Sequence, residues 1–322
     1  MSEKELFYQE KETCSIPFTH IMEDITESPL REIDETFGAA DTLSIQNAGK
    51  HRRILMALSA AGTLLTLFFL LYDEAEAHGL ILACGVMILC LFCIRRFANQ
   101  LDCHRKYLEY RVLAECLRCQ FFLSYAGIRT RVIEILPWSV RMEIPWITEV
   151  LQDILTKPAD EENIPASEAE RPILDCWIRD QKRYHQTALE KAEIKSRRDS
   201  RTAKVVLVIT IVVYLSALLY EVTIYRNAAG TGNADLIRAL LKILLGTMSA
   251  VTLFTGSYYG KMSLSNVIDD HKRMIALYKA SEEEILKNGE SEELLQFLAR
   301  EFLNENSTWY SYQSKNGPDI VI

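Results

Sequence analysis

Four long apolar stretches constrain this chain more than any other feature. They are Ile54–Tyr72, Gly79–Ile94, Val205–Tyr220 and about Leu240–Tyr259. The first three contain no charged residue, and the fourth contains only Lys242, whose ammonium group can reach the lipid headgroups. A helix needs about 20 predominantly apolar residues to cross the hydrocarbon core of a bilayer. Buried helices of a soluble protein are the alternative, but the arrangement as two close pairs favours four transmembrane helices in two hairpins.

Basic residues gather at the same end of every span and predict its orientation. The basic clusters are Lys50–Arg53, Arg95–Arg96, Lys195–Lys204 and Lys261–Arg273. The loop Asp73–His78 between the first two spans holds three acidic residues and no Lys or Arg. The loop between the other two spans is mixed, with Arg226 and Arg238 beside Glu221 and Asp235. We therefore expect both the N- and C-terminal parts to be cytoplasmic. The first 30 residues contain no apolar signal segment, so the first span is expected to drive insertion.

The segments outside the spans predict a helical soluble part. Apolar residues recur at helical spacing over 97–126, and 167–203, 261–288 and 291–303 also read as helical. The tail from Trp309 shows no helical pattern, and no segment shows the alternation of a strand. An acidic segment with two prolines, Lys157–Pro165, reads as a linker.

These observations predict an all-α membrane protein with long helices that extend into a cytoplasmic helical bundle. The expected division is an acidic cytoplasmic N-terminal segment (1–49), a first hairpin with a helical extension (50–130, spans about 54–72 and 79–95), a connector (131–166), a helical stalk with the second hairpin (167–288, spans about 204–221 and 239–259), and a C-terminal helix and tail (289–322).

Two segments that follow the hairpins resemble each other. LDCHRKYLEYR (101–111) and IDDHKRMIALYK (268–279) align without a gap and pair His104 with His271. Either the hairpin is duplicated as a parallel repeat, or two basic helices are alike by coincidence. The two histidines could form a pH or ligand switch below the spans, but an interfacial position beside lipid headgroups is favoured.

Motifs for catalysis are absent from the sequence. It contains no phosphate-binding loop, no HExxH and no GxSxG, so we expect no enzyme activity and no cofactor. The net charge of −8 and the lack of a dominant basic surface disfavour nucleic acid as a partner. Cys116 and Cys119 suggest a metal site, but a second ligand pair is missing, so packing on a helix face is favoured and no metal is expected. The eight cysteines are expected to be reduced thiols.

Two sets of residues are candidates for function. Small and hydroxyl residues form stripes on the first and fourth spans, where they could pack helices closely or line a pore in an oligomer. This set is Ser59, Gly62, Thr63, Thr66, Gly246, Ser249, Thr252 and Gly256. Polar and aromatic residues on two long soluble helices could form a docking face for a partner or signal, or pack within the stalk. This set is Arg111, Glu115, Arg118, Trp177, Gln181 and Tyr184, in which Arg111 and Glu115 have the spacing of a helical ion pair.

Four segments are similar to the SLATT family, the SMODS- and SLOG-associating two-transmembrane effectors of bacteria. They are ADTLSIQNAGKHRR before the first span, YRVLAECLRCQFFLSYAGI after the first hairpin, WIRDQKRYHQTALEKAEIKSRR before the third span, and LAREFLNENSTWYSYQ near the end. The resemblance covers most of residues 39–314 and is weaker over 130–170. It departs from the family in having two hairpins where the family name specifies two spans.

The resemblance implies a bacterial inner-membrane effector of an anti-phage or conflict system. Such an effector would oligomerise and permeabilise or depolarise the membrane when a nucleotide-sensing or nucleotide-producing partner signals. The alternatives are a non-conducting scaffold that recruits a soluble enzyme and a receptor that binds a ligand. The expected partners are thus the lipid bilayer, further copies of the chain and a nucleotide-sensing or nucleotide-producing protein.

Overall fold

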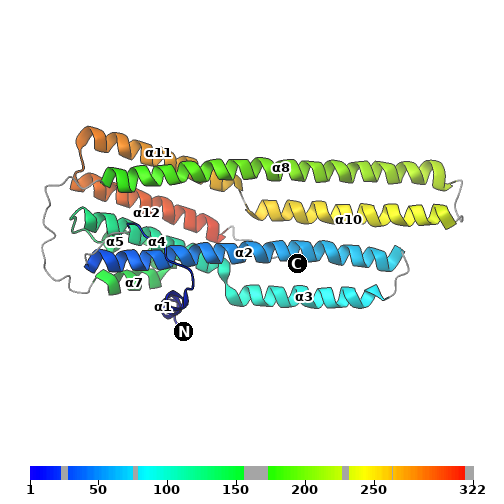
Figure 1. The fold of residues 1–322 in the computed structure, drawn as a ribbon, viewed down its shortest axis with the longest axis horizontal. Coiled ribbons are helices and arrows are strands. Elements are labelled where there is room, and N and C mark those ends of the chain that lie inside the picture. Colours follow the sequence, from blue (N-terminus) through cyan, green and yellow to red (C-terminus); the bar gives the residue numbers. More distant parts are fainter. Residues whose placement is uncertain (23–27, 75–78, 156–172, 227–231, 263, 316–322) are drawn as a thin grey trace. The chain divides into compact units, whose positions relative to one another are not determined.

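The computed structural model describes residues 1–22, 28–74, 79–155, 173–226, 232–262 and 264–315. Every regular element within these ranges is helical, so the predicted all-α class is confirmed for them (Figure 1). The elements are α1 Glu3–Thr13, α2 Ser28–Glu74, α3 Leu80–Leu101, α4 Cys103–Tyr125, α5 Val132–Ile135, α6 Trp138–Glu143, α7 Pro145–Leu155, the π-helix Leu174–Arg179, α8 Asp180–Tyr220, the π-helix Glu221–Tyr225, α10 Gly232–Met262, α11 Leu264–Asn288 and α12 Glu292–Lys315. The predicted linker Lys157–Pro165 lies outside the described residues.

The chain divides into two compact units that are both discontinuous in sequence. The first, called the core unit, contains the described residues of Met1–Lys50, Asp102–Leu189 and Asp269–Gly317. The second, called the apolar-helix unit, contains those of His51–Leu101 and Glu190–Ile268. Three of the described helices, α2, α8 and α11, contribute residues to both units.

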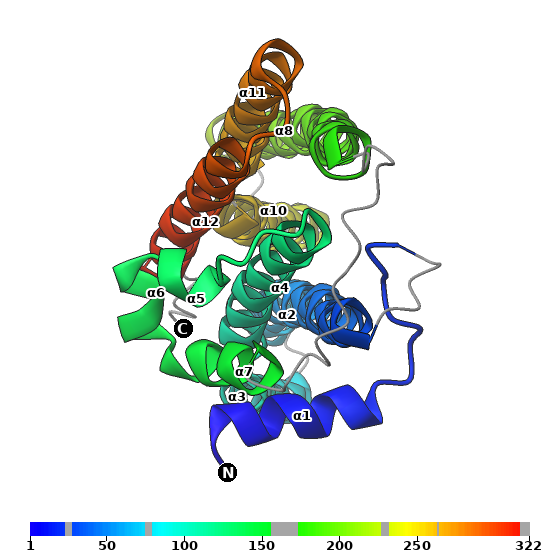
Figure 2. The ribbon, with the colours of Figure 1, turned by 90° about the vertical axis from the view of Figure 1, so that its left-hand side faces the viewer.

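The core unit is built around α4, which α5, α7 and α12 surround in Figure 2. Fifteen residues of α4 are buried, among them Leu113, Leu117 and Phe121. The acidic N-terminal segment also takes part, because the Phe7 side chain on α1 is fully buried and its ring lies 5.8 Å from that of Trp146 on α7. Burial of aromatic side chains of this kind stabilises the packing of the core unit.

Two helix boundaries differ from the sequence prediction. The predicted helix 97–126 is interrupted at Asp102, whose backbone is left-handed with φ of 46°. Aspartate tolerates this conformation, and its carboxylate accepts a hydrogen bond from Nε of Arg105 at 2.5 Å. The tail predicted to be non-helical from Trp309 is instead part of α12 as far as Lys315. Trp309 packs edge-on to Tyr107, a tertiary contact that local periodicity does not contain.

The apolar-helix unit contains the predicted spans. Among the residues that the structure describes, four helices, those containing α2, α3, α8 and α10, are long and apolar enough to cross a membrane. Only 6–11% of the residues in their most apolar windows are buried within the protein. Apolar helices that leave most of their surface uncovered require a lipid environment, so the membrane assignment is supported.

Polar groups near the ends of these helices are paired. Nζ of Lys242 on α10 donates to both carboxylate oxygens of Glu74 on α2, at 2.9 and 3.2 Å. Arg238 on α10 binds both oxygens of Glu221, at 3.0 and 2.8 Å. The bidentate pair neutralises one of the arginines that made this predicted loop mixed in charge.

Candidate functional site

Two glycines of the predicted span stripes, Gly62 and Gly246, lie at a close contact between α2 and α10. A Cβ atom added to Gly62 would lie 2.4 Å from Cζ of Phe254, and one added to Gly246 would lie 2.5 Å from Cδ1 of Leu70. Neither position can accept a larger side chain without movement of its neighbour. The two glycines therefore fit the packing alternative, in which small residues let helix backbones approach each other.

The threonine hydroxyls of these stripes mostly return to their own helices. Thr63 donates to the Ser59 carbonyl at 3.1 Å, and Thr66 donates to the Gly62 carbonyl at 3.0 Å. Such bonds satisfy a hydroxyl in an apolar environment without a second helix. Ser249, in contrast, is exposed on α10 of the single chain.

Thr252 on α10 meets a residue that the sequence analysis did not select. Its hydroxyl oxygen lies 2.9 Å from that of Thr210 on α8, and it also lies 2.9 Å from the Met248 carbonyl of its own helix. The signal for Thr210 was a hydroxyl in an otherwise aliphatic run, which by itself does not identify a partner. The pair joins α8 to α10 within the apolar-helix unit.

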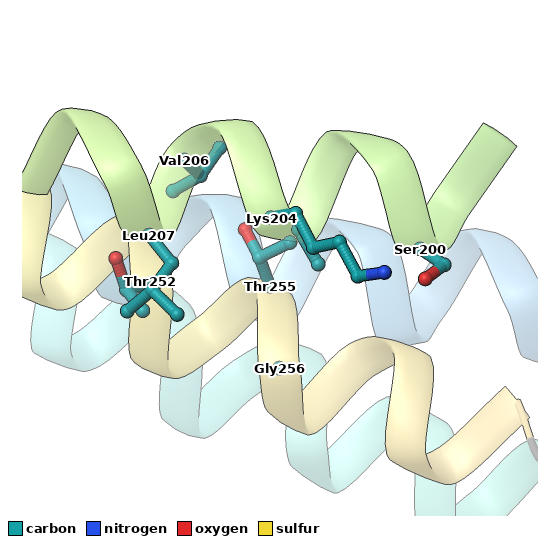
Figure 3. A pocket seen from close by; sticks show the side chains of 8 residues that line it. Ser200, Lys204, Val206, Leu207, Thr252, Thr255 and Gly256 are labelled. Carbon is teal, nitrogen blue, oxygen red and sulfur yellow. The ribbon is translucent and has the colours of Figure 1, made fainter.

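A groove of about 270 Å³ lies between α8 and α10 (Figure 3). Its α8 side is lined by Ser200, Ala203, Lys204, Val206 and Leu207, and its α10 side by Thr252, Thr255 and Gly256. Figure 3 shows the Lys204 side chain extending between the two helices with its ammonium group towards Ser200. A Cβ added to Gly256 would meet no atom within 4 Å, so this glycine borders open space, unlike Gly62 and Gly246.

The predicted ion pair on α4 is present in the core unit and belongs to a larger cluster. Arg111 contacts Glu115 at 2.6 Å, as its spacing predicted, and Arg118 contacts the same carboxylate at 2.6 Å. Arg111 also binds Asp41 on α2 at 3.0 Å. Burial raises the pKa of the Glu115 carboxyl, but the two guanidinium groups outweigh burial and hold this pKa below its usual value. Arg118 further lies over the Phe37 ring at 4.9 Å.

Two histidines pair beside this cluster. Nδ1 of His185 on α8 lies 2.9 Å from Nδ1 of His271 on α11, a distance at which one nitrogen donates and the other accepts. Burial lowers the pKa of both imidazoles, and the proximity of His271 lowers that of His185 further. The pair is therefore neutral near pH 7. His271 thus contacts His185 within the core unit.

His104, the counterpart of His271 in the proposed repeat, has a different environment. Its ring nitrogens are shielded from solvent, and the backbone of Gln313 at the end of α12 hydrogen-bonds to the side chain. Burial lowers the pKa of this imidazole. The two repeat segments also differ in backbone, because Asp102 interrupts the first whereas the second is continuous within α11.

The remaining residues of the predicted docking set, Trp177, Gln181 and Tyr184, differ in solvent exposure. Trp177 is 1% exposed and stacks on Phe122 with ring centroids 4.9 Å apart, so it packs the core rather than presenting a surface. Tyr184 is 50% exposed, whereas Gln181 is half-buried. Of Trp177, Gln181 and Tyr184, only Tyr184 therefore presents an exposed side chain to a partner.

The cysteine pair of α4 is part of the core. Cys116 and Cys119 are both buried, and burial raises the pKa of both thiols. This placement is the one expected if they pack on a helix face. Across the described residues, no group of three or more His, Cys, Asp or Glu side chains is arranged to hold a metal ion.

No protein-family model, no curated protein and no solved structure matches this chain.

Proposed function

We propose that this chain is a membrane effector that oligomerises and permeabilises or depolarises a bacterial inner membrane when a partner or nucleotide signal reaches its core unit. The observation that carries the proposal is the low burial of the four apolar helices: only 6–11% of the residues in their most apolar windows are buried within the protein. Lipid and further copies of the chain are the two surfaces that can cover them.

The proposed topology has two hairpins, α2 with α3 and α8 with α10, and both ends of the chain on the cytoplasmic side. The basic clusters at one end of the spans support this orientation. The core unit would then be the cytoplasmic bundle. Its water-compatible charge clusters and aromatic core support a soluble environment.

The route from signal to membrane would follow α2 and α8. Each is a continuous helix, Ser28–Glu74 and Asp180–Tyr220 respectively, and contributes residues to both units. A shift of either helix in the core unit could therefore be passed along its own backbone. The four similar segments named above relate this arrangement to the SLATT effectors, and the same resemblance supports a nucleotide-linked trigger.

The second candidate is a non-conducting scaffold or receptor that recruits a soluble enzyme. The exposed Tyr184 on α8 favours it, since its side chain is open to a partner on the core unit. The scaffold would bind its partner stably and leave the membrane sealed.

A liposome assay separates the two functions. The purified full chain, reconstituted in vesicles of bacterial phospholipid that contain a self-quenched dye, should release the dye and discharge a potassium gradient when challenged with a nucleotide panel. Chemical cross-linking in the same vesicles should show oligomers. Sealed vesicles under every challenge, together with a monomeric cross-linking pattern, would reject the permeabilising function and leave the scaffold.

Residue replacement then tests where a pathway lies. Ser249→Leu replaces an exposed hydroxyl on α10, and Ser216→Leu does the same on α8. If α10 lines the pathway, only the first variant reduces dye release. Equal release by both variants and the wild-type chain would exclude the exposed face of α10 around Ser249 from the pathway.

A further inference from the structure

The groove between α8 and α10 has one charged end and apolar walls. Lys204 and Ser200 lie at the charged end, one helical turn apart on α8. Val206 and Leu207 extend the groove into the apolar run that follows. Gly256 opposite contributes no side chain, and space is open where its Cβ would be. The groove thus changes from polar to apolar in the direction in which a bilayer does.

The charge of Lys204 favours an anionic ligand at this end of the groove. Among the side chains that the structure describes, no carboxylate forms an ion pair with Lys204, whereas Lys242 on α10 is paired with Glu74. Arg201 lies one turn before Lys204 on the same helix and adds positive charge to this end. A groove between transmembrane helices with basic residues at one end has the chemistry that recognises the phosphate of an anionic lipid.

We propose that this groove binds one anionic phospholipid, with its phosphate at Lys204 and Ser200 and an acyl chain along Val206, Leu207 and Gly256. A free phosphate or a nucleotide would use only the charged end and would leave the apolar walls exposed. A phospholipid covers both, since its charge and its hydrocarbon are separated as the lining is. The site holds for a permeabilising effector and for a non-conducting scaffold alike.

Lipid retention by the intact chain tests the site. The full chain is reconstituted in nanodiscs that contain equal parts of phosphatidylglycerol and phosphatidylcholine, then transferred to mild detergent and washed. Mass spectrometry counts the lipid that stays bound to each chain. We expect about one phosphatidylglycerol per chain and no retained phosphatidylcholine.

Four variants locate the bound lipid. Lys204→Gln should lower retention of phosphatidylglycerol about fivefold, the effect of about one juxtamembrane basic residue, and Lys204→Arg should restore it. Gly256→Leu should exclude the acyl chain and lower retention to a similar extent. Arg197→Gln is the charge control, because Arg197 is exposed on α8, outside the groove lining, and contacts Glu193. Size-exclusion profiles and circular dichroism verify that each variant is folded.

Several results would overturn the site. Unchanged retention by Lys204→Gln and Gly256→Leu would show that lipid does not occupy the groove. An equal loss from Arg197→Gln would show diffuse attraction to a basic helix. Equal retention of phosphatidylcholine would show apolar filling without headgroup recognition. Disulfide cross-linking between copies of a Gly256→Cys variant would show that a second copy of the chain fills the groove.

Discussion

Two consecutive helices of nearly equal length, α3 and α4, differ sharply in how many of their side chains are buried. α3 has 22 residues, and Cys84 is its one buried residue, whereas α4 has 23 residues, of which fifteen are buried. Yet α3 is the more apolar of the two, and α4 buries Glu109, Arg118 and Gln120. Burial in the protein therefore does not follow hydrophobicity along this chain. A helix whose side chains are covered by lipid can be uniformly apolar, whereas one covered by protein can bury polar groups if each finds a partner.

The largest test of this contrast compares an aromatic residue from each environment. Trp177 is 1% exposed and lies between Phe122 and Phe302, at centroid distances of 4.9 and 5.4 Å. Trp177→Ala should lower the free energy of unfolding by about 3–5 kcal/mol, because it leaves a cavity in a packed core. Phe92→Ala, at a position 65% exposed on α3, should cost less than about 0.5 kcal/mol in detergent. Thermal unfolding followed by circular dichroism measures both. Similar shifts from the two variants would remove the distinction between α3 and the core.

The next test concerns charge buried by α4. Glu115→Gln removes the carboxylate that neutralises Arg111 and Arg118, so two guanidinium groups lose their shared partner within the core unit. Such a loss should cost about 3 kcal/mol of stability. The matched control is Glu35→Gln on α2, where an exposed pair with Arg31 at 3.0 Å should contribute less than about 0.5 kcal/mol. Denaturant titration of the two variants gives the comparison, and a cost for Glu115→Gln no greater than that of the control would show that the cluster is solvated.

The histidine pair predicts a fall in stability at acidic pH. The pKa of His185 and that of His271 are lowered by burial, so the unfolded chain takes up protons near its ordinary histidine pKa of 6.5 before the folded chain does. Stability conferred by the neutral pair is therefore present above about pH 6.5 and is lost as pH falls towards the lowered values. Between pH 7 and pH 5 the loss should be roughly 2 kcal/mol for one such group.

Unfolding measured at several pH values tests this sign. The nearby Glu115 opposes the effect and the nearby Arg111 and Arg118 reinforce it, since they favour and disfavour an imidazolium respectively. His271→Gln should reduce the slope of stability against pH, whereas Tyr184→Phe, which keeps both histidines and the aromatic ring beside His185, should leave it unchanged. A wild-type stability that rises on acidification from pH 7 to pH 5 would contradict the assignment.

The features that the sequence could predict are those carried by local patterns. Apolar runs identified the helices that can cross a membrane, and a spacing of four residues identified the Arg111–Glu115 pair. Local patterns did not predict the end of α12 or the helix break at Asp102. The first depends on packing of Trp309 against Tyr107, and the second on a local turn that interrupts an otherwise helical pattern.

The polar clusters show the same limit at the candidate sites. Arg111 meets Asp41 across 70 residues of sequence, and His185 meets His271 across 86. Nothing in either local segment specifies such a partner. Trp177 shows a different limit, because an aromatic residue on a helical face fits both a docking surface and a protein core. Only the tertiary structure places it in the core.

The smallest predicted effect tests how polar contacts behave on the lipid-covered side of the comparison. The hydroxyls of Thr210 and Thr252 contribute two hydrogens to three close contacts: the 2.9 Å contact between them and one 2.9 Å contact from each to its own helix, at Val206 and Met248. One hydroxyl therefore donates across to the other, which donates to its own carbonyl. Thr210→Val leaves Thr252 able to donate to Met248, so no buried donor loses its acceptor. The loss should be about 0.6 kcal/mol, the average for hydrogen bonds between transmembrane helices.

A double-mutant cycle isolates the contribution of the hydrogen bond between Thr210 and Thr252. Thr210→Val, Thr252→Val and the double variant should give a coupling of about 0.6 kcal/mol in denaturation from mixed micelles. Thr66→Val supplies the control, because the Thr66 hydroxyl bonds to the Gly62 carbonyl of its own helix and should show no coupling to Thr210. A coupling of several kcal/mol for the threonine pair would mean that a polar contact among these apolar helices contributes as much to stability as the charged contacts around α4. The difference between the two environments would then lie in which side chains are present, and not in how strongly each environment depends on polar partners.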